Sequence, residues 1–300
     1  MNLFQNPDWV TLQISGHSAL EDIPQPFFDK INEGLIRLSK NDTPVVSIVI
    51  PVWNEELNIV KTLFSLSQNV TTHATEVIVV NNNSKDRTEE VLSKFKIKSL
   101  FQRVQGCGPA RQVGQAQAAG KYILMADADC FYPTAWIQTM IDKLQPEEVS
   151  CVYGRHSFIA NSRLQRFNFF LYEILRDFLI ELRHFKRPYL NALGMGMAYK
   201  KEYGLKVGFD LRNVRGEDGR LCFDLMQFGK IAKIPRSLRV WTAPRTIGKE
   251  RGLLFSLSKR LVIEFSRFHE FFYKKQTHDT HASKNYSTFK FKWFNKDKKG

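Results

Sequence analysis

The sequence predicts a doubly wound α/β fold, in which a mixed, mostly parallel sheet carries helices on both faces. The main observation is a unit of strand, polar turn and helix that recurs three times within about eighty residues and is followed by a fourth apolar strand. Such continuous apolar runs are typical of strands buried on both faces of a parallel sheet. Ligands of these sheets bind at the carboxyl ends of the strands, so the polar turns there mark the expected site.

Each element in the first half follows from a local pattern. The predicted strands cover 45–52, 76–80, 98–104 and 122–126. Each is followed by a predicted helix. The first helix begins at 54–56, the second runs from the turn 81–86 to about Phe95, the third begins near Pro109 and the fourth at 130–133.

The second half is less regular. A long amphipathic helix is predicted over 163–185, another opens at Gly216, and residues 239–245 follow the last expected strand. The long helix has an apolar stripe at three- and four-residue spacing, made of Leu164, Phe167, Leu171, Ile174, Phe178, Leu182 and Phe185. Because such stripes usually face a core, we expect this one to be buried.

Composition fits a globular protein. Hydrophobic residues make up 43% of the 300 residues, which excludes disorder throughout. The formal charge is +14, and residues 251–300, with twelve Lys/Arg and four Asp/Glu, contribute +8 of it. This charge suits polyanions, acidic membranes or phosphorylated small molecules.

We expect four segments. Residues 1–43 form an N-terminal extension, 44–248 the α/β domain, 249–275 a basic amphipathic helical extension and 276–300 a basic flexible tail. The four cysteines form no C-x-x-C pair, which favours a reducing, cytoplasmic location. No signal pattern and no apolar run of about eighteen residues is found, so membrane contact is expected to be peripheral, at the inner face.

The central motif is Asp127-Ala128-Asp129, directly after the fourth strand. Two carboxylates separated by one residue in a turn can point at one hard cation, and Mg²⁺ and Mn²⁺ favour such ligands together with substrate phosphates. A solvated turn or a helix cap is the alternative. The runs 51–56 and 81–86 stand at two neighbouring strand ends, where their side chains can bind a base and ribose or simply stabilise turns.

These strand-end motifs, together with residues 108–114 and the Asp-x-Asp turn, resemble the family 2 inverting glycosyltransferases with the GT-A fold, over about 45–245. The resemblance implies a nucleotide-diphosphate sugar donor and makes 44–248 the catalytic domain. It places Asp129 at the metal and diphosphate, with Asp127 nearer the ribose as a second acid. The implied donor-binding residues are Pro51, Trp53, Glu55, Asn82, Arg111, Asp127 and Arg245. Asn81 and Asn83 depart from the Asp and Gly that are commoner in the family.

The resemblance also assigns the chemistry. Glu217 and Asp218 match an acidic pair that faces the acceptor, and Asp218 is preferred to Glu217 as the general base for an inverting displacement. The alternative is a helix start that favours acids through its dipole. The Gln-x-x-Arg-Trp motif of processive synthases is missing, which favours transfer of one sugar at a time.

The implied acceptor is a saccharide or a lipid-linked molecule, in polysaccharide or glycolipid biosynthesis. The basic helix at 249–275 has two interpretations, namely contact with an anionic membrane surface or packing on protein. Nucleic acid is not an expected partner, and the oligomeric state stays open. The rival functions are a sugar-phosphate nucleotidyltransferase, a non-catalytic nucleotide-sugar or membrane-binding protein, and a retaining GT-A transferase.

Overall fold

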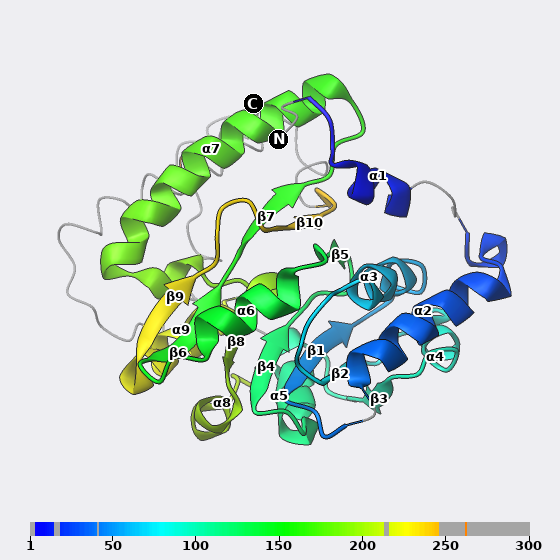
Figure 1. Ribbon diagram of the computed structural model, residues 1–300, viewed down its shortest axis with the longest axis horizontal. Coiled ribbons are helices and arrows are strands. Elements are labelled where there is room, and N and C mark those ends of the chain that lie inside the picture. Colours follow the sequence, from blue (N-terminus) through cyan, green and yellow to red (C-terminus); the bar gives the residue numbers. More distant parts are fainter. Residues whose placement is uncertain (1–3, 15–18, 41, 213–215, 246–261, 263–300) are drawn as a thin grey trace, which may run out of the picture.

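The computed structural model describes residues 4–14, 19–40, 42–212, 216–245 and 262. Its centre is a seven-stranded sheet (Figure 1). In spatial order the strands are β3 (Lys98–Phe101), β2 (Thr75–Asn81), β1 (Val46–Val52), β4 (Tyr122–Met125), β8 (Met197–Lys200), β6 (Val149–Tyr153) and β9 (Lys230–Lys233). Only β8 runs antiparallel to its neighbours in this sheet.

Helices cover both faces of the sheet because alternate side chains of its strands point to opposite sides. Ile48 and Ile50 of β1 enter one core, whereas Val49 between them enters the other. The first core is completed by α2 (Gln25–Ser39), α3 (Asn58–Ser67), α4 (Thr88–Leu92) and α6 (Trp136–Leu144). The second is completed by α5 (Cys107–Gln117), α8 (Lys201–Val207) and α9 (Glu217–Leu225). The predicted doubly wound α/β fold is confirmed.

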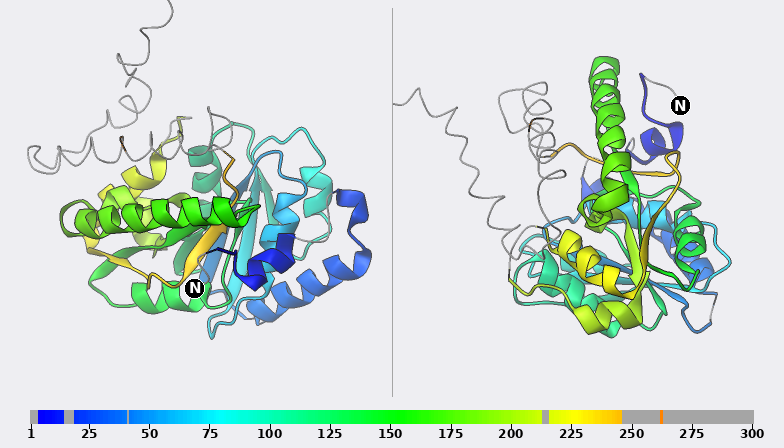
Figure 2. Two further views of the ribbon diagram at one scale, coloured as in Figure 1. Left: turned by 90° about the horizontal axis from the view of Figure 1, so that it is seen from above. Right: turned by 90° about the vertical axis from the view of Figure 1, so that its left-hand side faces the viewer.

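A second, smaller sheet lies beside the first. It contains β5 (Cys130–Phe131), β10 (Arg239–Thr242) and β7 (Arg155–Phe158), with β10 in the middle. The helices α1 (Asp8–Ile14) and α7 (Arg163–Lys186) lie on the same side of the molecule as this sheet (Figure 1). In the side view of Figure 2, α7 projects beyond the rest of the described chain.

The element boundaries differ from the sequence prediction in several places. Residues 130–133 do not start a helix: β5 comes first, and α6 begins at Trp136. Residues 239–242 do not follow the last strand but form it. The helix after β1 begins at Asn58 rather than 54–56, α4 ends at Leu92 rather than Phe95, and β3 ends at Phe101 rather than 104. The strands β6, β7 and β8 were not predicted.

The prediction that the stripe of α7 is buried was wrong. Leu164, Leu171, Ile174, Phe178 and Phe185 are exposed, while Phe167 and Leu182 are half-buried. The buried face of this helix instead combines four apolar or aromatic side chains with four charged ones, and these are Phe169, Tyr172, Leu179, Ile180, Arg166, Glu173, Arg176 and Asp177. Arginines on β7 and β10 form ion pairs with Asp177, and burial of these charges requires such partners, so this face turns inward even though the exposed stripe is apolar.

The N-terminal segment contributes α2, which packs on α3 and β2 and places Phe28, Ile31 and Leu35 in the first core.

Of the residues that the structure describes, none forms a helix with both the length and the hydropathy that a membrane span requires. The expected helix at 249–275 and the tail at 276–300 lie outside the described residues, apart from Val262.

Candidate active site

A cavity of about 370 Å³ opens at the carboxyl ends of β1, β2 and β4. This volume falls within the range of roughly 300–1,000 Å³ usual for small-molecule sites. Nine of the ten residues proposed from the sequence line it, and they are Pro51, Trp53, Glu55, Asn82, Arg111, Asp127, Asp129, Glu217 and Asp218. The tenth, Arg245, forms ion pairs with two of them. The fold thus brings together side chains from both halves of the chain.

The turn after β1 presents an aromatic ring to the cavity. Trp53 is 54% exposed, although it lies beside the fully buried end of β1. The next residue, Asn54, adopts a left-handed conformation with φ of 53°. Its backbone NH donates to Ser84 Oγ (3.0 Å) and its side-chain oxygen accepts from the NH of Lys85 (2.7 Å). These bonds tie the turns after β1 and β2 together and hold Trp53 at the rim.

The three asparagines after β2 mainly organise the backbone. Asn83 is left-handed, with φ of 62°, and the side chain of Asn81 accepts from the NH of Ser84 (3.0 Å). The amide of buried Asn82 donates to the carbonyl of Val104 (2.7 Å) and accepts from the NH of Gly106 (2.7 Å). Asn82 therefore lines the cavity while its polar atoms hold the loop that leads into α5.

The Asp-x-Asp turn is held from two sides. Thr62 on α3 donates its hydroxyl to the carbonyls of Ala128 (2.9 Å) and Cys130 (3.0 Å). The NH of Asp127 donates to the hydroxyl of buried Tyr132 (2.8 Å). These bonds satisfy the turn's backbone, so the two carboxylates keep their orientation into the cavity.

The turn offers a ligand set for a hard divalent cation. Ligand atoms of Asp127, Asp129 and Cys130 lie within 4.8 Å of one another. Burial and the nearby Asp129 raise the pKa of the Cys130 thiol well above its usual range, so this sulfur stays protonated. The two carboxylates are the usable ligands, and oxygen donors fit Mg²⁺ or Mn²⁺. Burial, followed by the charge of Asp127, raises the pKa of Asp129, and a bound cation would reverse that effect.

Arg111 lies between the two acidic motifs and joins them. From α5 its guanidinium pairs with Asp127 (2.9 Å) and with Glu217 (2.5 Å). Burial alone would lower the pKa of Arg111, but Asp127 and Glu217 raise it above the usual value, so the side chain is a permanent cation. Gly194 is needed beside it, because a Cβ there would stand 1.8 Å from Arg111 Nη2.

Glu217 and Asp218 begin α9, after Gly216 in a left-handed conformation. Asp218 accepts hydrogen bonds from the NH groups of Gly194 (2.8 Å) and Gly219 (2.8 Å). It forms no ion pair among the described residues, whereas Glu217 is buried against Arg111. Burial also raises the pKa of Glu217. The geometry leaves Asp218 as the more accessible proton acceptor of the two.

Arg245 lies beside the cavity, three residues beyond the end of β10. Its guanidinium binds both carboxylate oxygens of Glu55, one at 2.6 Å, and its Nε lies 3.4 Å from Asp129. A two-point guanidinium contact of this type also suits phosphate. Around the cavity, the described charged residues are five carboxylates and the two guanidiniums of Arg111 and Arg245. The charged side chains that surround the cavity are therefore net negative among the described residues.

Several lining residues were not proposed from the sequence, namely Val52, Cys107, Ala128, Leu193, Gly194 and Met195. The Gly/Met-rich run 194–197 was visible in the sequence, but nothing in it indicated a ligand. Its role depends on contact with Arg111 and Asp218, which come from distant segments.

The sheet topology and the acidic cavity at its strand ends define the GT-A class of nucleotide-sugar transferase folds. Residues 47–202 match Glycosyl transferase family 2, which is more than half of the chain. The chain therefore belongs to this family. The match includes the Asp-x-Asp turn and Arg111, but it ends before Glu217, Asp218 and Arg245.

Relatives with curated names agree with this assignment. Glycosyltransferase AglE of Haloferax volcanii is 33% identical over 122 residues, which cover 38% of this chain and 40% of that protein. Chondroitin synthase of Escherichia coli is 29% identical over 125 residues, covering 39% of this chain and 18% of that protein. The chain thus matches less than half the length of these relatives.

Solved structures share the fold at low identity. The mannosyltransferase PcManGT from Pyrobaculum calidifontis, in complex with GDP-Man and Mn²⁺, has a TM-score of 0.55 at 18% identity, covering 82% of this chain and 73% of that chain. Glucosyl-3-phosphoglycerate synthase from Mycobacterium tuberculosis, in complex with Mn²⁺, UDP-Glc and phosphoglyceric acid, has a TM-score of 0.51 at 17% identity, covering 78% and 83%. The predicted GT-A fold is confirmed.

Proposed function

We propose that this protein is a metal-dependent glycosyltransferase that moves one sugar from a nucleotide-diphosphate donor to an acceptor hydroxyl, with inversion at the anomeric carbon. The observation that carries the proposal is the convergence of Asp127, Asp129 and Asp218 on one cavity, with Arg245 paired to Asp129 beside it. The named fold relatives bound to Mn²⁺ and nucleotide sugars support it.

In this proposal the donor lies across the strand ends. Trp53 stacks on the base, and the backbone around Pro51, Glu55 and Asn82 shapes the base and ribose site. Asp127, held by Arg111, faces the ribose, and the carboxylates of Asp127 and Asp129 would together hold the metal. A bound Mg²⁺ or Mn²⁺ would neutralise charge on the leaving diphosphate. Arg245, released from Glu55, is the phosphate clamp.

Asp218 is the proposed base. Its carboxylate is oriented by the NH groups of Gly194 and Gly219 and is free of ion pairs among the described residues. It accepts the acceptor's proton while the hydroxyl oxygen attacks the anomeric carbon from the face opposite the diphosphate. Glu217, paired with Arg111, positions this network. The acceptor is a saccharide or a lipid-linked molecule, in polysaccharide or glycolipid synthesis at the cytoplasmic face.

The reaction can be tested without knowing the acceptor, because water can replace it. The full chain is incubated with Mn²⁺ and a panel of α-linked UDP-, GDP- and TDP-sugars, and the released sugar is followed by proton NMR. We expect slow hydrolysis of one donor with the β-anomer appearing first. An α-anomer appearing first would contradict inversion, and release that persists undiminished in chelator would contradict metal dependence.

A further inference from the structure

The outward side of α7 is an apolar surface, which we call the outer α7 face and define by Leu164, Leu171, Ile174, Phe178 and Phe185. Their exposed fractions are 71%, 51%, 47%, 58% and 82%. At 100° and 1.5 Å per residue, they fall within an arc of about 80° and a length of about 32 Å. Contiguous apolar surface of this extent usually marks an interaction site.

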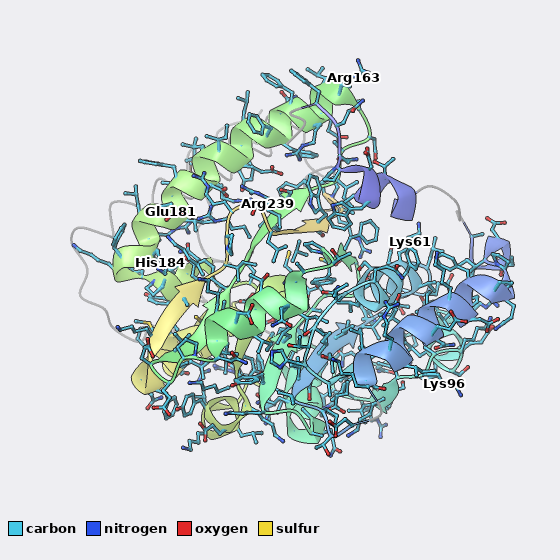
Figure 3. The ribbon with its side chains drawn as sticks, in the orientation of Figure 1. Lys61, Lys96, Arg163, Glu181, His184 and Arg239 are labelled. Atoms are coloured by element: carbon cyan, nitrogen blue, oxygen red, sulfur yellow. The ribbon has the colours of Figure 1, made fainter. Side chains whose placement is uncertain are left out.

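The acidic residues of α7 face the rest of the protein, whereas its exposed charged residues are basic. All three acidic residues of the helix are engaged in ion pairs: Glu173 with Arg166, and Asp177 and Glu181 with arginines and a lysine of the strands. Figure 3 shows Arg239 between α7 and the strands. The two exposed charges of α7 are the cations Arg163 and Lys186, one at each end of the helix. The outer α7 face is therefore apolar with basic ends.

This charge pattern selects among the candidate occupants. In a pair of α7 helices from two copies, cationic ends would meet cationic ends in either orientation. The segment 249–275 of this chain is also basic, with seven Lys/Arg residues against the three glutamates Glu250, Glu264 and Glu270. Only an anionic surface is complementary to both the ends and the apolar middle of α7.

We propose that α7 docks on anionic bilayers, with the outer α7 face at the boundary between headgroups and acyl chains. In this position Arg163 and Lys186 contact lipid phosphates. Basic helices with Phe and Leu on one face bind membranes in this way, and their binding grows with buried apolar area and with anionic lipid content. This surface is separate from the segment 249–275, for which membrane contact was one of two interpretations.

Docking through α7 would also orient the cavity. The helix continues through Arg187 and the 3-10 turn Pro188–Asn191 into Leu193, Gly194 and Met195, which line the cavity. Gly194 in turn holds Asp218, the proposed base. Gly194, which orients the proposed base, thus follows Phe185 of the outer α7 face by nine residues along the chain. This places the acceptor in the class of membrane-anchored hydroxyl compounds, a step that rests on the proposed function.

The test is flotation of the full chain with vesicles of phosphatidylcholine alone or mixed with phosphatidylglycerol. We expect binding only to the anionic vesicles, weakened by salt, and about tenfold or more weaker in Leu171→Glu/Phe178→Glu. The matched control, Val70→Glu/Leu205→Glu, adds the same charge at exposed apolar positions away from α7 and is expected to bind like the wild type. Donor binding, measured by calorimetry, is expected to be unchanged in both variants.

Three results would overturn the proposal. The first is equal vesicle binding by the α7 variant and the wild type. The second is a loss of binding in Leu257→Glu/Leu261→Glu without any loss in the α7 variant, which would assign the membrane contact to the C-terminal segment. The third is a wild-type dimer in sedimentation that the α7 variant converts to monomer, which would assign the outer α7 face to a second copy. Because vesicle binding needs no donor, its failure is distinguishable from failure of the proposed transferase.

Discussion

The two halves of the molecule hold their helices by different means. In the first half, strands β1, β2 and β4 are apolar on both faces and pack against the apolar faces of α3 and α5. In the second half, α7 combines a small apolar cluster around Phe169 and Tyr172 with buried ion pairs centred on Asp177, which join it to β7 and β10. An apolar stripe thus marks the core in one half and the outer surface in the other.

The halves also divide the proposed chemistry, and this gives the largest expected effect. Asp129 of the first half is assigned to the metal, whereas Asp218 of the second half is assigned to proton transfer. Asp218→Asn is expected to lower turnover by about 10²–10⁴-fold, with donor affinity nearly unchanged, measured by kinetics and calorimetry. Glu217→Gln is the control, because it removes the neighbouring carboxylate, which pairs with Arg111 and is not the proposed base. Equal loss of turnover and donor binding in Asp218→Asn would contradict its role as base.

The ion-paired attachment of α7 predicts a large effect on stability. Asp177→Asn removes the anion that faces Arg155 and Arg239, both of which are buried. Removing one partner of a buried ion pair costs about 3–5 kcal/mol, because the remaining charges lose their compensation. Urea unfolding measures the change. A loss below about 1 kcal/mol would mean that α7 is held mainly by apolar contacts.

The same substitution in the two halves sharpens the comparison. Ile48 in β1 is fully buried, whereas Ile174 on α7 is 47% exposed. Ile48→Ala is expected to lower the free energy of unfolding by about 2–5 kcal/mol, from lost burial and a cavity. Ile174→Ala is expected to change it by no more than about 0.5 kcal/mol. Similar losses in both variants would show that the outer α7 face is covered in solution.

The contact between the halves at Arg111 predicts a smaller effect. In Gly194→Ala the new methyl group would stand within 1.8 Å of the Arg111 guanidinium, which must move. Overpacking of this kind costs about 1–3 kcal/mol. Donor affinity should fall as well, because Asp127 loses its partner. Thermal unfolding and calorimetry report the two effects, and an unchanged donor affinity would show that Arg111 does not position Asp127.

The smallest effect concerns Asp129 without metal. Its raised pKa means that the folded protein disfavours the charged carboxylate, so this residue lowers stability as pH rises through that pKa. Asp129→Asn should therefore unfold at the same or a slightly higher temperature at neutral pH in chelator, with no difference below the usual pKa range of aspartate. A clear loss of stability at neutral pH would contradict this, and would mean that the ion pair of Asp129 with Arg245 outweighs the cost of burying the carboxylate.

Sequence patterns predicted the first half well because its strands are continuous apolar runs, such as 46–52, and their polar ends must meet at one sheet edge. For the same reason the sequence placed Glu55, Asp127 and Asp129 at this edge of the sheet, where they line the cavity. The short strand β8 and the role of Gly194 were not found, because each depends on partners far away in the chain. The orientation of α7 was predicted wrongly since the ion-pair partners of Asp177 lie on β7 and β10.

The most direct test of the central claim is calorimetric titration of UDP-, GDP- and TDP-sugars into the full chain, with and without Mn²⁺, using Asp129→Asn as the control. We predict that one donor binds in the presence of Mn²⁺, and that binding is lost in chelator and in the variant. Binding of no donor, or equal binding with and without metal, would contradict a metal-dependent nucleotide-sugar site at these strand ends.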